Sequence, residues 1–238
     1  MPEQTQKDFS KLYTPIAIVL AGVIIGGFAM VGISKMGAAG GGEQLAEVDI
    51  ADVTLEGVPY IGEEDAPVVL AYWSDYQCPF CKAVEMGHPQ IPTEPALPPL
   101  IKEYVDTGKL RIVFKDYAFL SEDSTTAALW GRAVWDLYPS TYFAWREAMF
   151  TAQDEEHAGF GDEASIFALT KTIAGIDANA VKTRVGSNSA EYLNLIEADK
   201  VEGTNMGVQG TPGFITGKVL LPGAMPLSDF KAAIDAQL

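Results

Sequence analysis

A nearly continuous apolar run, Ala66–Ser74 (APVVLAYWS), is the feature that most limits how this chain of 238 residues can fold. Such a run is typical of a strand that is covered on both faces, as in a parallel sheet between helices. A second run, Lys109–Ala118, alternates apolar and polar side chains and predicts another strand. A helix between the two strands would complete a βαβ unit, which is almost always right-handed with parallel strands.

The segment 121–206 is predicted to be mostly helical, because apolar side chains recur there at helical spacing. Pro139, Gly159–Gly161 and Gly175 interrupt the pattern and divide it into several shorter helices. The clearest apolar stripe consists of Ala127, Trp130, Val134, Leu137 and Tyr138. We interpret this stripe as core rather than as a cofactor site.

The C-terminal part of the chain predicts a hairpin followed by a helix. Gly213–Gly223 contains two apolar runs around Gly217-Lys218, the spacing of a two-residue hairpin turn. Pro226–Leu238 has apolar residues at helical spacing, and Ser228 is a candidate cap for that helix.

The chain has two cysteines, Cys78 and Cys81, just after the first predicted strand. Pro79 suits the first turn of a helix, which places Cys78 at the N-cap and Cys81 one turn further on. The sulfur of Cys78 then faces the free amides of Phe80 and Cys81 and the positive end of the helix dipole. Both favour the thiolate, so Cys78 is the predicted nucleophile and Cys81 the resolving thiol. Pro79 and Phe80, between the two thiols, are expected to tune their redox properties.

Two other uses of this cysteine pair stay open at this point. A purely structural disulfide would close a loop of four residues, which constrains the unfolded chain little. A zinc site needs four ligands, and only His88 and His157 are available to join the cysteines. We predict no metal and interpret both histidines as surface residues.

Two separated stretches, YWSDYQCPFCKAV at 72–84 and VQGTPGFITGKVLLPGAMPLSDFKAAI at 208–234, resemble the DsbA-like thiol–disulfide oxidoreductases of the thioredoxin superfamily. The similarity covers roughly residues 58–238. It implies an α/β, thioredoxin-like fold with a helical domain, about 121–206, inserted between the second and third strands. It also implies that Pro212 is a cis-proline facing the cysteines, and that the backbone of Thr211 pairs with the substrate.

The chain departs from this family in a proline-rich segment, Met86–Pro99, where relatives usually continue one long helix. Five prolines fall within it, and no helix interior tolerates them. The helix that begins at the cysteines should therefore end near Gly87, and a new one should begin near Ala96 or Pro99. The segment is either a surface loop or a docking feature for a partner.

An uncharged stretch, residues 13–34, predicts a single transmembrane anchor, since about 20 apolar residues cross a bilayer as a helix. The basic residues around it favour a short cytoplasmic N-terminus at 1–12. Alternatively, Gly37–Ala39 is compatible with the cleavage site of a signal peptide. In both cases the rest of the chain lies outside the cytoplasm, behind a small-residue and acidic stretch, 35–57, that predicts a flexible tether.

The formal charge of −16, from 32 acidic and 16 basic side chains, argues against nucleic-acid binding, which needs clustered Lys and Arg. An acidic surface keeps a chain soluble, and it is typical both of ordinary acidic proteins and of proteins from saline habitats. The predicted partners are therefore proteins and a membrane, and no nucleic acid.

Together these features predict a membrane-anchored, extracytoplasmic thiol–disulfide oxidoreductase that oxidises substrate thiols. No cofactor is predicted, because the electrons reside on the redox-active pair Cys78 and Cys81. The resemblance implies secreted or membrane proteins with cysteines as substrates, and a membrane quinone-linked thiol oxidase that regenerates the pair. Strongly oxidising relatives carry a histidine where this chain has Phe80, so reductase or isomerase activity stays open. The alternative of another class is a non-enzymatic thioredoxin-fold module that holds a client or assembly partner.

Overall fold

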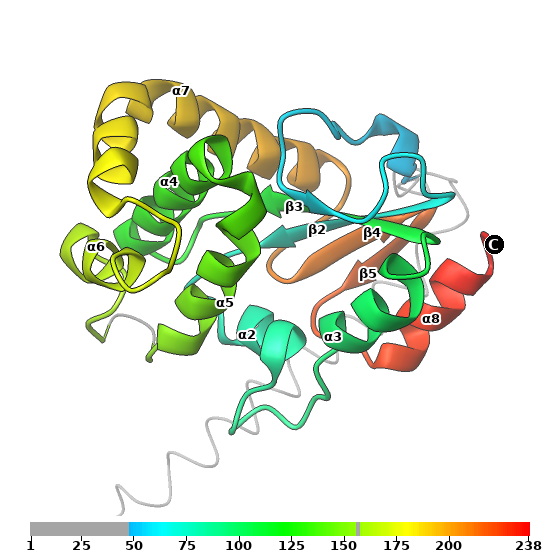
Figure 1. Cartoon of the computed structure of the whole chain (residues 1–238). Coiled ribbons are helices and arrows are strands. Elements are labelled where there is room, and N and C mark those ends of the chain that lie inside the picture. Colours follow the sequence, from blue (N-terminus) through cyan, green and yellow to red (C-terminus); the bar gives the residue numbers. More distant parts are fainter. Residues whose placement is uncertain (1–47, 156–157) are drawn as a thin grey trace, which may run out of the picture. The chain divides into compact units, whose positions relative to one another are not determined.

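A five-stranded mixed sheet organises the computed structural model, which describes residues 48–155 and 158–238 (Figure 1). In spatial order the strands are β1 (Tyr60–Ile61), β3 (Leu110–Asp116), β2 (Val68–Ser74), β4 (Gly213–Thr216) and β5 (Val219–Pro222). Strands β2 and β3 are parallel, and every other neighbouring pair is antiparallel. The predicted βαβ unit is therefore confirmed, and the short edge strand β1 is an addition that its two residues were too few to predict.

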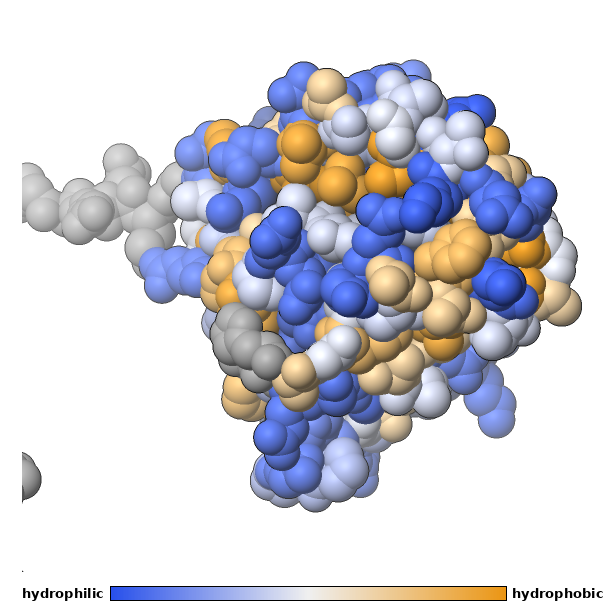
Figure 2. Space-filling view, turned by 90° about the vertical axis from the view of Figure 1, so that its left-hand side faces the viewer, coloured by the Kyte–Doolittle hydropathy of each residue, from blue (hydrophilic) through white to orange (hydrophobic). Residues whose placement is uncertain are grey.

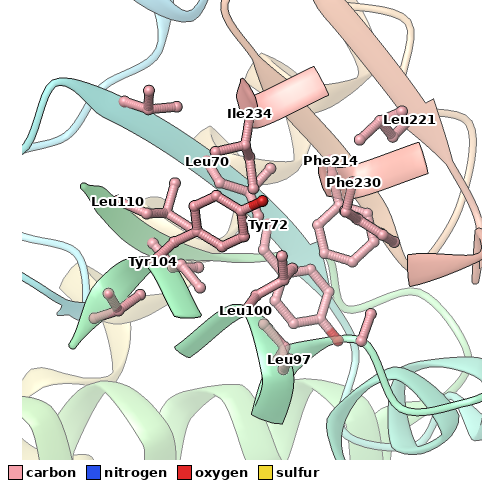
Figure 3. Packing of buried hydrophobic residues seen from close by; sticks show 14 of the residues in the cluster. Leu70, Tyr72, Leu97, Leu100, Tyr104, Leu110, Phe214, Leu221, Phe230 and Ile234 are labelled. Carbon is pink, nitrogen blue, oxygen red and sulfur yellow. The ribbon is translucent and has the colours of Figure 1, made fainter. Parts of the chain in front are cut away.

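The central strand β2 is buried almost throughout, as its apolar sequence predicts. Its side chains alternate between the two faces of the sheet. On one face Leu70 and Tyr72 join a cluster that α8 (Leu227–Asp235) covers with Phe230 and Ile234 (Figure 3). On the other face Ala71 and Trp73 pack into a separate cluster. The sheet therefore separates two apolar layers.

The helical insertion lies between β3 and β4, which are the second and third of the strands predicted from the sequence. It consists of α4 (Glu122–Leu137), the short 3-10 turn η3 (Pro139–Thr141), α5 (Tyr142–Ala152), α6 (Glu163–Thr170) and α7 (Ala178–Asn205). The predicted breaks all interrupt the α-helices: Pro139 opens η3 between α4 and α5, Gly159–Gly161 lies between α5 and α6, and Gly175 lies between α6 and α7. Its core contains Trp130, with Trp145 and Phe150. On the side of the domain that carries α6, patches of apolar residues lie scattered among hydrophilic residues (Figure 2).

The proline-rich segment separates two short helices as predicted. Helix α2 (Pro79–Met86) ends at Gly87, whose φ of +88° is a left-handed conformation that favours glycine. Helix α3 (Leu97–Leu100) starts after Ala96 and continues into a π-helical turn, η2 (Ile101–Val105). Both predicted boundaries are confirmed.

The C-terminal hairpin turns at Gly217-Lys218, as the sequence predicts. The cap predicted for the last helix is wrong. Helix α8 begins at Leu227, so Ser228 lies inside its first turn, and its hydroxyl donates to the Asp229 carboxylate at 3.4 Å. Pro226 occupies the N-cap instead.

The predicted flexible tether, 35–57, needs correction at its C-terminal end, because residues 48–57 pack on the domain. Val53 is buried in the layer that contains Trp73. The amide of Ile50, in the 3-10 turn η1 (Ile50–Asp52), donates to Gly217 O at 2.7 Å. The abundance of acidic residues dominated the prediction, whereas apolar residues among them supply the contacts. The predicted N-terminus (1–12), anchor (13–34) and the remaining tether lie outside the described residues.

Within residues 48–155 and 158–238, no helix combines the length and the apolar character that crossing a membrane requires.

A buried network of charges joins the insertion to the sheet. The Lys115 ammonium, on β3, lies 2.6 Å from Asp199 Oδ1 and 3.0 Å from Glu202 Oε2, both on α7. It also donates to Thr54 O at 3.0 Å, which attaches the N-terminal segment. Asp199 pairs in addition with Arg132 of α4. Buried charges of this kind are tolerated only when they are paired.

We expect Lys115→Met to destabilise the domain by about 3–5 kcal/mol, because it removes the ammonium from the buried carboxylate of Asp199 and the partly buried carboxylate of Glu202. Urea unfolding measures the free energy. The control is Lys231→Met, which removes an ion pair to Glu103 whose side chains are 32% and 47% exposed and should cost about 0.5 kcal/mol or less. Similar losses in the two variants would contradict the structural role assigned to the buried network.

Candidate active site

The cysteines occupy the start of α2, where the chain leaves the central strand β2. Cys78 is the N-cap residue, with an extended backbone (φ −78°, ψ 118°), and Cys81 lies one turn further on. The amides of Cys81 and Lys82 donate to Cys78 O at 3.1 and 3.2 Å and close the first turn. Both cysteines are free thiols in the structure. Cys78 retains 4% exposure, while Cys81 is fully buried.

The two residues between the cysteines differ in exposure. Pro79 opens the helix at a position that suits proline, and its side chain is partly buried. Phe80 is 50% exposed, although it is a large apolar side chain. An exposed aromatic ring beside a reactive sulfur is available for contact with another polypeptide.

Thr211 and Pro212 reach the cysteines from the far end of the sequence. Because β2 and β4 are antiparallel neighbours, with Trp73 opposite Gly213, the end of β2 lies beside the residues that precede β4. The Thr211–Pro212 bond is cis, as predicted from the resemblance. The Cys78 thiol donates to Thr211 O at 3.3 Å. The structure thus brings all six predicted site residues, Cys78, Pro79, Phe80, Cys81, Thr211 and Pro212, to one end of the sheet.

The surroundings shift the pKa values of the two thiols in opposite directions. A hydrogen bond from the Cys81 thiol lowers the pKa of Cys78, and Thr211 and the amides of Cys81 and Phe80 lower it further, while burial opposes them. Burial raises the pKa of Cys81 well above its ordinary value, and its proximity to Cys78 adds to the effect. A thiolate forms first on Cys78, and the buried Cys81 holds its proton.

Asp75 fixes the loop before the cysteines, and the sequence analysis missed it. Its carboxylate accepts from the amide of Gln77 at 2.9 Å and from the amides of Phe119 and Leu120 at 3.0 and 3.4 Å. It thereby links the loop after β2 to the loop after β3. Burial raises the pKa of Asp75, while the amide donors lower it.

A second group that the sequence analysis missed is the pair formed by Glu85 on α2, which is partly buried, and Arg146 on α5, which is buried. Arg146 Nε and Nη2 lie 2.9 and 2.6 Å from Glu85 Oε1, and Nη2 also donates to Ser74 Oγ at 2.9 Å. Burial raises the pKa of Glu85, and Arg146 lowers it. The pair holds the active-site helix against the insertion.

A groove of about 730 Å³ runs beside Phe80. Its lining comes from α2, from the proline-rich segment and from the residues after α5: Pro79, Phe80, Lys82, His88, Pro89, Gln90, Ile91, Gln153, Asp154 and Glu155. The proline-rich segment therefore borders the exposed aromatic ring of Phe80, next to the cysteines.

His88, the histidine that lies among the described residues, does not form a metal site with the cysteines. His88 is partly buried, and its Nδ1 accepts from the amide of Gln90 at 3.2 Å. His157 lies outside the described residues. Across 48–155 and 158–238, no group of three or more His, Cys, Asp and Glu side chains is arranged to hold a metal ion.

We expect the thiolate absorbance of the reduced domain to rise at a lower pH than that of an ordinary cysteine, and Cys78→Ser to abolish this step. Because the folded state lowers the pKa of Cys78, the thiolate stabilises the reduced fold fully above the unfolded value of about 8.5, and this gain is lost as pH falls through the folded pKa. Urea unfolding of wild type and Cys78→Ser across this window measures it. A step that stays in Cys78→Ser would assign the acidic thiol to Cys81.

Comparison with known proteins supports this picture. The sequence model of the thioredoxin family matches residues 54–236. Disulfide bond formation protein D of Bacillus subtilis (strain 168) is 23% identical over 185 residues, which are 78% of this chain and 79% of that protein. The crystal structure of oxidised BdbD from Bacillus subtilis has a TM-score of 0.67 at 23% identity, and covers 77% of this chain and 94% of that chain.

The thiol-disulfide exchange protein alpha-DsbA2 of Wolbachia pipientis has a TM-score of 0.63 at 27% identity, over 76% of this chain and 87% of that chain. These solved structures share the arrangement of the described domain. The family match extends from the N-terminal segment before β1 into α8 and includes both cysteines and the cis-proline. The DsbA-like resemblance is thereby confirmed, and the chain belongs to the thioredoxin family.

Proposed function

We propose that this protein is a thiol–disulfide oxidoreductase that oxidises the thiols of substrate proteins outside the cytoplasm. The observation that carries the proposal is the pair of thiols at the N-terminus of α2, whose surroundings shift their pKa values in opposite directions. Cys78 has a lowered pKa and residual exposure, whereas Cys81 has a raised pKa and is fully buried. Such a pair has one sulfur that exchanges with partners and one that resolves the product.

The reaction begins from the Cys78–Cys81 disulfide. A substrate thiolate attacks Cys78 Sγ, the bond to Cys81 breaks, and Cys81 leaves with the electron pair and takes up a proton. A second substrate thiolate then attacks the substrate sulfur of this mixed disulfide and releases Cys78 as a thiolate. The substrate gains a disulfide, and two electrons remain on the cysteine pair. Stabilisation of the Cys78 thiolate favours this last step because a thiol of low pKa is the better leaving group.

The substrate segment would lie between the cis-proline loop and the groove beside Phe80. Thr211 O already accepts a hydrogen bond from Cys78, so a backbone paired with Thr211 would pass next to the sulfur. The aromatic ring of Phe80 and the groove that it borders offer apolar contact on the other side.

Several parts of the proposal extend beyond the domain. Related proteins named for disulfide bond formation support the oxidising direction. An extracytoplasmic location fits that direction, because thiols are kept reduced in the cytoplasm. The uncharged stretch 13–34 would anchor the chain in the membrane, with the redox domain on the outer side. A membrane quinone-linked thiol oxidase would remove the two electrons. Reductase or isomerase activity is the alternative within the same chemistry.

A second candidate function is that of a binding module without turnover. The groove beside Phe80 favours it, because a cavity of this size next to an exposed ring can hold a partner segment whether or not exchange occurs. The two functions separate in one assay: only an oxidoreductase accelerates disulfide formation in a reduced model protein.

Substrate trapping should distinguish the two cysteines. Without Cys81, a mixed disulfide on Cys78 can no longer be released by attack of Cys81 on the Cys78 sulfur, so Cys81→Ser should accumulate substrate adducts. Cys78→Ser should accumulate none, because Cys81 is fully buried. Nonreducing gels of cells that express each variant give the measurement. Equal capture by both variants would show that the roles of the two thiols are wrongly assigned.

The reduction potential should lie between that of thioredoxin, about −270 mV, and that of DsbA, about −120 mV. The helix N-terminus stabilises the Cys78 thiolate and so the reduced form, but Phe80 adds no charge to it. Equilibration in glutathione buffers, followed by alkylation and mass spectrometry, measures the potential. A value at or below that of thioredoxin would overturn the oxidising direction and favour a reductase or isomerase.

A further inference from the structure

Gln153 is a buried polar residue that joins the helical insertion to the cysteine loop. It follows the last residue of α5 and is 7% exposed. Its side-chain amide nitrogen donates to Tyr76 O at 2.7 Å and to Cys78 O at 3.1 Å. An amide group has two N–H donors, so both are used. One binds the carbonyl of Cys78 itself, and the other binds the carbonyl of Tyr76, two residues earlier.

The carbonyl oxygen of Cys78 accepts hydrogen bonds from three donors. It already accepts from the amides of Cys81 and Lys82, which form the first turn of α2. Gln153 adds a third donor to the same oxygen. Because the peptide plane after Cys78 is fixed by this oxygen, the direction in which the Cys78 side chain leaves the backbone is fixed as well.

A reciprocal contact runs from the active-site helix back to the insertion. The Lys82 ammonium, on α2, donates to the backbone carbonyl of Gln153 at 2.9 Å. This carbonyl lies at the C-terminus of α5, where carbonyls lack partners inside the helix and cations are favoured. The two helices are thus linked in both directions through Gln153.

We propose that Gln153 is a positioning residue for the exchange reaction: it holds the backbone of Cys78 so that the sulfur stays beside the first turn of α2. The inference rests on the proposed function and adds the means by which the insertion acts on it. The helical insertion would then set the reactivity of the thiol, in addition to covering the sheet.

The proposed positioning role predicts that the stability of the Cys78 thiolate depends on the hydrogen bonds of Gln153. If Gln153 loses its donors, the peptide planes around Cys78 can rotate, and the sulfur spends less time near the amides of Phe80 and Cys81. The thiolate is then less stable, and less of it is present at a given pH. Loss of a hydrogen bond in the insertion that does not reach the cysteine loop has no such effect.

The test compares Gln153→Met, which keeps the length of the side chain and removes both donors, with Thr170→Val. Thr170 accepts from Trp145 Nε1 at 2.9 Å, within the insertion, so its loss controls for a missing buried hydrogen bond. The readouts are thiolate absorbance against pH, the rate of iodoacetamide alkylation of Cys78 below the titration midpoint, and urea unfolding. They need no substrate, so they are independent of the direction of electron flow.

We expect Gln153→Met to lower the thiolate fraction and the alkylation rate below the midpoint by about three- to tenfold, the range of one hydrogen bond. Thr170→Val should keep the wild-type titration of the Cys78 thiol, even if its unfolding free energy falls as much as that of Gln153→Met. If Gln153→Met does not fold, Gln153→Asn, whose shorter amide cannot reach both carbonyls, carries the same expectation. A variant with lower stability and an unchanged titration would overturn the proposal and leave Gln153 a structural residue.

A parallel assay of disulfide exchange with a reduced model protein separates the two levels. If wild type does not exchange while the titration depends on Gln153, the proposed function fails and the positioning role stands. If wild type exchanges at a rate that Gln153→Met leaves unchanged, and the titration is unchanged too, the positioning role fails alone.

Discussion

Pairing of β2 along both of its edges decides where every group of the site lies. The parallel pair with β3 places the ends of both strands at the same edge of the sheet, and the antiparallel pair with β4 brings the start of β4 to that edge. Three loops distant in sequence therefore meet there. One carries Cys78, the second binds Asp75 through its amides, and the third presents Thr211 and Pro212.

The insertion is attached to this frame by polar groups as much as by apolar packing. Arg146 reaches Glu85 under the active-site helix, and Asp199 accepts from Lys115 and Arg132 behind the sheet. Each such group costs free energy to bury unless its partners are in place. A wrong docking of the insertion would leave charges unpaired, whereas a purely apolar interface would tolerate small shifts. The contacts thus favour one orientation of the helices over the cysteines.

Local chemistry made part of this site predictable. Cys78 could be placed at a helix N-cap because Pro79 and the apolar strand before it are neighbours in sequence. Gln153 and Arg146 could not be found in this way, since they act on residues some 60 to 80 positions away and gain meaning only once α5 packs on α2. The packed segment 48–57 was missed because its apolar residues are few and lie among acids.

The interruption of α2 after eight residues has a further consequence for how such a protein can diverge. The favourable field at a helix N-terminus arises mainly in the first turn, so the chain beyond Gly87 contributes little to the stability of the Cys78 thiolate. The same distal segment supplies His88, Pro89, Gln90 and Ile91 to the wall of the groove beside Phe80. Insertions or substitutions there change the shape of the groove proposed for the substrate, while the surroundings of the Cys78 sulfur stay as they are. The shape of this groove and the redox strength of the cysteine pair can therefore evolve independently on this scaffold.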